Sequence, residues 1–145
     1  LILRSKEKKI APGVWSGIGG KLEQNELNEP EAACLREIEE ETGITAEHIH
    51  DLKLRYIIIR RTEDTIRQSY IYFGKTAIQT FTDTDEGKLY WISESELLNR
   101  TFTKTFELML KHFTIVPDTE RVVVGVAENG GGQCHMTWSA VEDFE

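Results

Sequence analysis

Three glutamates in the segment Arg-Glu-Ile-Glu-Glu-Glu-Thr-Gly-Ile, residues 36–44, have the spacing of one helical face. Glu37, Glu40 and Glu41 stand at positions i, i+3 and i+4, so a helix through them brings their carboxylates together. Like charges at this spacing destabilise an isolated helix, and a cation offsets that cost. Mg²⁺ takes oxygen ligands and binds carboxylates together with substrate phosphates. The face therefore indicates a metal site for phosphate chemistry; the alternative is an acidic surface exposed to solvent.

Residues beside this face are candidates to complete the site. Arg36 is adjacent to Glu37 and is expected to orient or screen one carboxylate. The turn at Gly19 and Gly20 is expected to place a backbone carbonyl beside the same metal, because glycines permit close backbone approach.

The net charge of the chain is concentrated around the same segment. The 145 residues include 17 Lys and Arg against 25 Asp and Glu, a formal charge of −8, and residues 21–41 alone carry −6. The remainder is nearly neutral, which argues against a protein that coats a nucleic-acid polymer, since that needs a basic surface. The sequence shows no run of about 18 apolar residues, no signal-peptide pattern and no disulfide framework. A cytoplasmic location with no membrane partner is expected.

Capping signals predict where the acidic helix begins and ends. Asn28 with Glu31 three residues later fits a capping box, and Pro30 falls in the first turn. Gly43 predicts the C-terminal stop. The three glutamates then occupy the last turns of the helix.

Strand patterns occupy much of the rest of the chain. Residues 52–61 and 66–78 are rich in β-branched and aromatic side chains and predict an antiparallel hairpin. Residues 89–92 predict another short strand, and residues 121–138 predict a last hairpin around a glycine-rich turn.

A second helix is expected between the last two strand regions. It is predicted to begin at Ser93 or Ser95 and to continue to about Phe113, with an apolar face made of Leu97, Leu98, Phe106, Met109 and Leu110. Two helices with mixed strands predict an α+β fold.

Together with Gly20 and Glu26, the segment 36–44 resembles the signature of the Nudix hydrolase family, G-x5-E-x7-R-E-U-x-E-E-x-G-U, where U is a bulky aliphatic residue. The helical half fits at every position. Nine residues rather than seven separate Glu26 from Arg36, so this loop carries a two-residue insertion. The insertion leaves open whether the first glutamate of the signature is Glu23, Glu26 or Glu29.

The flanking residues extend the resemblance. Residues 1–4 look like the family's strand before the signature, and residues 14–21 look like the MutT-type branch that hydrolyses oxidised purine nucleoside triphosphates. Glu86-Gly87 ahead of residues 90–92 is similar to the distal glutamate loop of that branch. The resemblance implies a single Nudix domain over residues 1–145, an α/β/α sandwich with a mixed sheet. Since the chain begins inside a strand without Met, further residues are expected upstream.

The resemblance also implies an activity and a cofactor. It implies attack of water on phosphorus that depends on Mg²⁺, with Mn²⁺ as a substitute, and conversion of a nucleoside triphosphate such as 8-oxo-dGTP to the monophosphate and pyrophosphate. The implied metal ligands are Gly20, Glu37, Glu40, Glu41 and Glu86. Arg36 joins these glutamates as a catalytic candidate, and the general base is Glu37 or Glu86. The implied substrate-binding residues are Arg4, Trp15, Ser16, Lys21 and Asn99.

Several alternatives stay open at this point. Trp15 fits an anchor beside the glycine turn as well as a base-stacking residue, and Asn99 fits an exposed helix surface as well as a base contact. The substrate could instead be ADP-ribose or another nucleoside diphosphate derivative. A non-catalytic module that senses a nucleotide is the alternative outside the enzymes. The oligomeric state is left open.

Overall fold

The structure is a computed structural model that describes residues 1–7, 12–82, 84–116 and 120–143. The chain forms two compact units. The first contains Leu1–Leu52 and Gly74–Thr103, and the second contains Lys53–Phe73 and Lys104–Glu145. No helix of the described residues is long and apolar enough to cross a membrane.

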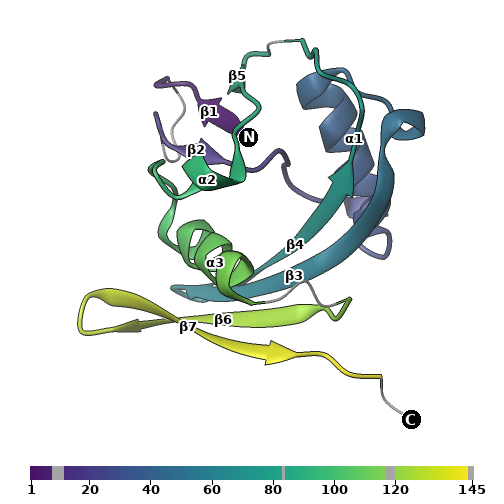
Figure 1. Cartoon of the computed structure of the whole chain (residues 1–145). Coiled ribbons are helices and arrows are strands. Elements are labelled where there is room, and N and C mark those ends of the chain that lie inside the picture. The colour runs from purple at the N-terminus through teal and green to yellow at the C-terminus, as the bar shows by residue number, and fades with distance from the viewer. Residues whose placement is uncertain (8–11, 83, 117–119, 144–145) are drawn as a thin grey trace. The chain divides into compact units, whose positions relative to one another are not determined.

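A three-stranded antiparallel sheet, in the order β2-β1-β5, forms part of the first unit (Figure 1). Its strands are β1 (Ile2–Arg4), β2 (Trp15–Ser16) and β5 (Gly87–Leu89). In the register of β1, Ile2 faces Ser16 on one side and Leu89 on the other. Ile2 and Leu89 are buried, so this sheet anchors the core of the unit.

Strand β5 begins two residues earlier than predicted and ends at Leu89 rather than Ile92. It begins at Gly87 because the backbone there lies against the carbonyl of Leu3, where a Cβ would collide with the oxygen. Tyr90, the next predicted residue, still exchanges backbone hydrogen bonds with Leu1, whereas Trp91 is 54% exposed.

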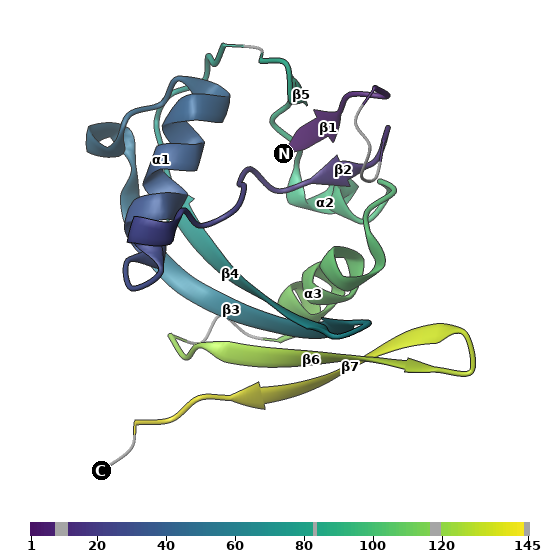
Figure 2. The same cartoon turned by 180° about the vertical axis from the view of Figure 1, so that it is seen from behind.

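Helix α1 (Pro30–Thr42) carries the glutamate segment in the first unit (Figure 2). Gly43 ends it in the left-handed conformation, as predicted, and its N–H donates to the carbonyl of Glu39. The predicted capping box of Asn28 and Glu31 is wrong. Pro30 takes the first helical position and moves the N-cap to Glu29, whose side chain makes no capping hydrogen bond.

The predicted second helix is in fact two helices. α2 (Glu94–Leu97) lies in the first unit, and α3 (Lys104–Ile115) lies in the second. Between them the backbone carbonyl of Thr101 accepts a hydrogen bond from the N–H of Trp15, and Phe102 is buried. Because these tertiary contacts hold the segment extended, Leu98 is 42% exposed instead of lying on an apolar helical face.

The second unit contains most of a mixed four-stranded sheet in the order β4-β3-β6-β7 (Figure 1). The hairpin strands β3 (His50–Thr62) and β4 (Thr65–Lys75) are close to their predicted bounds. The last hairpin consists of β6 (Val123–Gly130) and β7 (Gln133–Ala140), which pair antiparallel. β6 is parallel to β3, so the sheet is mixed.

Aromatic and aliphatic side chains join α3 to this sheet. Tyr56 on β3 lies edge-on to the ring of His112, and its hydroxyl is 3.0 Å from Nδ1 of that histidine. The His112 ring also lies 4.4 Å from the Trp138 ring on β7. Met109 and Leu110 of α3 are buried, so the inner face of α3 forms the core of this unit.

Gly125 on β6 provides a test of the contact between the two strands of the last hairpin. A Cβ at this position would lie within 2.8 Å of the Trp138 ring and 2.7 Å from Cε of Met136. Gly125→Ala is therefore expected to destabilise the protein by about 1–3 kcal/mol through overpacking, measured by urea unfolding. Gly130→Ala is the matched control, because a Cβ there would have its nearest contact at 3.6 Å. An equal loss in both variants would contradict the packing account.

Candidate active site

Arg36 on α1 binds Glu26 in the preceding loop through two parallel contacts. Nε of Arg36 donates to Oε1 of Glu26 at 2.7 Å, and Nη2 donates to Oε2 at 2.9 Å. Glu26 also accepts the backbone N–H of Glu23 at 2.8 Å. These contacts, with the Arg36 hydrogen bonds first, lower the pKa of Glu26 to about 2. Among the three open alternatives for the first signature glutamate, Glu26 is therefore the one that faces Arg36.

The same guanidinium also connects two of the helical glutamates. Nη1 of Arg36 donates to Oε1 of Glu37 and to Oε2 of Glu40, each at 2.9 Å. The Glu37 side chain is 15% exposed, whereas the Glu40 side chain is 58% exposed. Glu40 thus lies at the solvent side of Arg36 and Glu37 lies on the buried side.

Glu41 is the buried carboxylate of the segment, at 9% exposure. Its Oε2 accepts the backbone N–H of Gly19 at 3.1 Å. Burial, together with the charges of Glu37 and Glu86, raises the pKa of Glu41 to about 7 against the opposing effects of Gly19 and Arg4. Glu37, Glu41 and Glu86 are therefore close enough for their charges to interact.

Gly20 brings the loop backbone against the helix. A Cβ at Gly20 would collide with both carboxylate oxygens of Glu37, so only glycine fits this approach. The loop backbone thus lies beside the carboxylates, with the N–H of Gly19 donating to Glu41.

The donor set fits a hard divalent cation. It consists of carboxylate oxygens and glycine backbone, and the pKa of Glu41 is raised first by burial and then by the charges of Glu37 and Glu86, effects that a cation would offset. As the side chains lie, no three His, Cys, Asp or Glu residues within the described ranges converge closely enough to hold a metal. Glu37 and Glu40 instead converge on the same nitrogen, Nη1 of Arg36.

Of the predicted phosphate-binding cations in this unit, the structure places Arg4 near the carboxylates, whereas Lys21 is fixed there only by its backbone. Arg4 on β1 is close enough to lower the pKa of Glu41, and the carbonyl of Lys21 accepts Nη2 of Arg36 at 3.3 Å. Arg4 also lines a cavity of about 770 Å³ with Lys6 and Lys88. Lys6 and Lys88 were not predicted to bind substrate. Their positions in the sequence could have indicated them, because Lys6 lies in the basic segment 5–10 and Lys88 follows Glu86 by two residues.

The structure gives the other predicted substrate-binding residues local partners. The centroid of the Trp15 ring lies 5.2 Å from that of Tyr90, and the Arg100 guanidinium lies 5.3 Å from the Trp15 centroid. These contacts favour the interpretation of Trp15 as an anchor beside the glycine turn. Ser16 donates its hydroxyl to the carbonyl of Gly17 at 3.0 Å. Asn99 is exposed and donates to Glu96, as an external helix surface would.

The contact between Arg36 and Glu26 predicts a specific effect of pH on stability. Because the folded pKa of Glu26 lies below its ordinary value, its contribution is complete above about pH 4.5 and disappears as the pH falls toward 2. The Tm difference between the unmodified protein and Glu26→Gln should therefore shrink between pH 6 and pH 3. Exposed Glu29 supplies the matched control, Glu29→Gln. A difference that stays constant with pH would contradict the ion pair.

Two comparisons place this site among known proteins. The family model of the NUDIX domain matches residues 1–113. The crystal structure of a MutT mutator protein from Bacillus halodurans is similar to 93% of this chain and 86% of that chain, with a TM-score of 0.68 and 20% identity. The structural likeness shows the fold, and with the family match it confirms the predicted α+β Nudix fold with a mixed sheet.

The family match covers the acidic helix, the glycine turn and the Glu86 loop, which are the parts that form the carboxylate site. It ends before β6 and β7, which lie at residues 123–140. The chain belongs to the NUDIX domain family and is a Nudix hydrolase, an enzyme that acts on acid anhydrides.

Proposed function

We propose that this Nudix hydrolase cleaves a nucleoside triphosphate to the monophosphate and pyrophosphate in a reaction that depends on Mg²⁺, with Mn²⁺ as a substitute. A purine nucleotide oxidised at the base, such as 8-oxo-dGTP, is the candidate substrate. At the coarser level of the family, the activity is pyrophosphohydrolysis of nucleoside diphosphate derivatives with a divalent ion. The observation that carries the proposal is that Glu37 lies against the Gly20 backbone, while buried Glu41 accepts the Gly19 N–H within reach of the charges of Glu37 and Glu86.

In this proposal the ion is held by the carbonyl of Gly20 and by carboxylates of Glu37, Glu41 and Glu86, with Glu40 at the solvent side. When bound, it acidifies water and neutralises charge on the phosphates. The buried position of Glu41 supports this assignment, because a cation is the partner that keeps a desolvated carboxylate ionised near neutral pH.

The chain's own residues supply orientation and proton transfer. Arg36 fixes Glu37 through Oε1, so Oε2 is the atom available to accept a proton from the attacking water. Glu86 is the other candidate for the general base. Arg36 is a positioning residue in this scheme, since its contacts are with Glu26, Glu37 and Glu40 rather than with substrate.

Basic side chains support the binding of a polyanion at an acidic site. Arg4, Lys6 and Lys88 line the cavity beside β1 and β5, and Lys21 is exposed in the loop before α1. Phosphoryl transfer depends mostly on positioning and charge neutralisation, so cations that contact the phosphates complement the metal.

Glu41→Gln separates catalysis from folding. The amide keeps the size of the side chain and removes a buried charge, so kcat with saturating Mg²⁺ should fall by about 10²-fold or more. The Tm of the metal-free protein should stay equal or rise, since repulsion from Glu37 and Glu86 is relieved. Exposed Glu39 provides the control Glu39→Gln, which should keep full activity. An unchanged kcat for Glu41→Gln would contradict the metal assignment.

A substrate panel tests the nucleotide class. The kcat/KM with Mg²⁺ is measured for normal and oxidised nucleoside triphosphates, ADP-ribose and dinucleoside polyphosphates. The proposal expects the highest value for a nucleoside triphosphate. A preference for ADP-ribose would contradict the MutT-type substrate while leaving the Nudix hydrolase assignment intact, and cleavage of none of them would favour a nucleotide-sensing module.

A further inference from the structure

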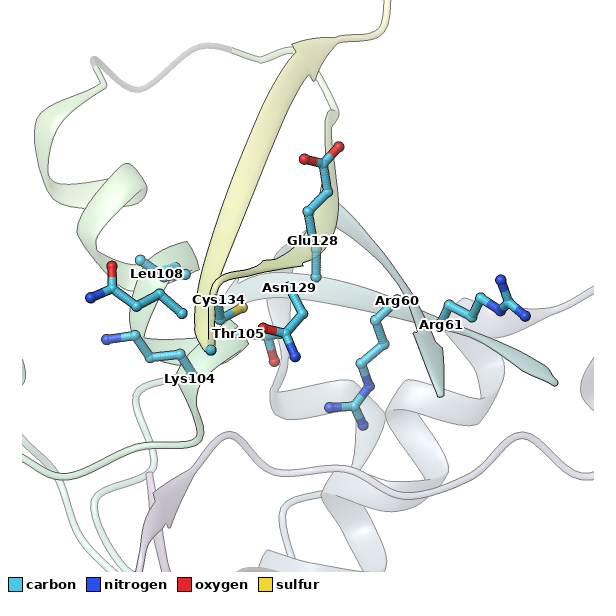
Figure 3. Close-up of a pocket in the computed structure, with 11 residues that line it drawn as sticks. Arg60, Arg61, Lys104, Thr105, Leu108, Glu128, Asn129 and Cys134 are labelled. Carbon is cyan, nitrogen blue, oxygen red and sulfur yellow. The ribbon is translucent and has the colours of Figure 1, made fainter. Parts of the chain in front are cut away.

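The second unit contains a cavity of about 750 Å³ that the proposed hydrolysis does not use. Its walls come from the end of β3, the first turns of α3 and the hairpin of β6 and β7 (Figure 3). The volume lies within the range of small-molecule sites, about 300–1,000 Å³. The hairpin lies beyond the segment that matches the family model, so this wall is an addition to the NUDIX domain match.

Arg60 puts a cation on the apolar face of β3. Tyr56 and Ile58, at two-residue spacing before it, are 3% and 4% exposed. Side chains alternate across a strand, so Arg60 shares their face. Its Nε is buried and has no hydrogen-bond partner in the described part of the chain. A buried donor without an acceptor is costly, and a ligand oxygen would satisfy it.

The strand register explains why space exists beside Arg60. In the parallel pair of β3 and β6, Arg60 is opposite Ala127. One step earlier on the same face, the side chains of Trp138 and Met136 fill the space above Gly125. The small Ala127 side chain leaves the next position open.

Polar groups surround this open position. Asn129 is paired with Cys134 across the hairpin, and both residues line the cavity. Thr105 and Lys104 reach it from the first turn of α3. Figure 3 shows Arg60, Asn129 and Thr105 grouped together.

The acidic residues near the cavity do not neutralise Arg60. Glu128 lines the cavity, but its side chain points away from the Arg60 guanidinium (Figure 3). Glu107 accepts hydrogen bonds from both Lys104 and Lys111, so one carboxylate is shared by two lysines. Arg61 is turned to the other side and donates to the carbonyl of Glu63 at 2.7 Å. Lys104 is thus paired with Glu107, and the positive charge left to the cavity is that of Arg60.

We propose that this cavity binds the phosphate group of a small phosphorylated molecule. Arg60 supplies the cation, and the Thr105 hydroxyl and Asn129 amide supply further donors. A phosphate offers more acceptor oxygens than a carboxylate and so matches this set of donors better. Leu108 and Ala127 provide an apolar wall for the rest of the molecule. The inference depends only on the second unit and not on the proposed hydrolysis.

Cys134 supplies a direct reporter of occupancy because its side chain lines the cavity and is half-buried. The rate of its alkylation by iodoacetamide is followed by peptide mass mapping, in the presence of EDTA so that no metal-dependent binding or hydrolysis contributes. The probes are inorganic pyrophosphate, adenosine monophosphate and citrate. Cys34 is the internal control, since burial raises the pKa of its thiol to about 11.

Saturable slowing of Cys134 alkylation by pyrophosphate or adenosine monophosphate is expected, with Cys34 unchanged. Arg60→Gln should weaken the protection about tenfold or more, as loss of a charge-assisted hydrogen bond does. Exposed Arg67 on β4 is not among the residues that line the cavity, so Arg67→Gln is the matched control with the same loss of charge. Because Nε of Arg60 has no partner, Arg60→Gln should not lower the Tm.

Three outcomes would overturn the proposal. Absence of protection by millimolar pyrophosphate and adenosine monophosphate would show that the cavity takes no phosphate. An equal loss in Arg60→Gln and Arg67→Gln would assign the effect to net charge. Equal protection by citrate would remove the preference for phosphate. None of these results depends on whether the enzyme hydrolyses nucleoside triphosphates, so the two proposals fail separately.

Discussion

The contact between Arg36 and Glu26 holds the loop before α1 against the helix that carries the glutamates, and the carboxylate site depends on it. One guanidinium binds Glu26 by two atoms and also reaches Glu37, Glu40 and the carbonyl of Lys21. Arginine suits this position because its planar fork holds several oxygens at once, which the point charge of a lysine does not. The loop that it fixes leads directly back to Gly19 and Gly20. Their approach to Glu41 and Glu37 is thus linked to the same cation.

Arg36 binds Glu26, Glu37 and Glu40 but makes no hydrogen bond to Glu41, the most buried carboxylate of the segment. Glu41 faces the Gly19 N–H and the negative charges of Glu37 and Glu86. An interior acid with acidic neighbours reduces stability, so its presence is explained by function rather than by folding. The site therefore has one half in which Arg36 pairs with carboxylates and a second half, around Glu41, in which negative charges lie close together. The proposed cation is assigned to the second half.

The sequence predicted the parts of this site whose residue spacing is fixed by one helix. Glu37, Glu40, Glu41 and the stop at Gly43 required only the helical period. Which loop glutamate meets Arg36 was not predictable, because the two-residue insertion changes the loop path and only the folded contact selects Glu26. The break between α2 and α3 was also missed. The apolar pattern is compatible with one helix, and it is the hydrogen bond from Trp15 to Thr101 that holds the segment extended.

The cavity beside Arg60 was hidden from the sequence for a different reason. The run from Tyr56 to Ile59 is apolar at every position. The sequence pattern therefore does not tell whether the even-numbered or the odd-numbered residues of the strand face the core. The face is defined only when α3 covers it, with His112 against Tyr56 and with Ile58 buried. Arg60 then continues the inward face, whereas the adjacent Arg61 does not. Arg60 and Arg61 look equivalent in the sequence, but their hydrogen bonding differs. Nε of Arg61 donates to the carbonyl of Glu63 in the adjacent turn, whereas Nε of Arg60 is buried at the cavity without a partner among the described residues. A break in the polar pattern of this kind is expected where binding, rather than folding, determines the residue.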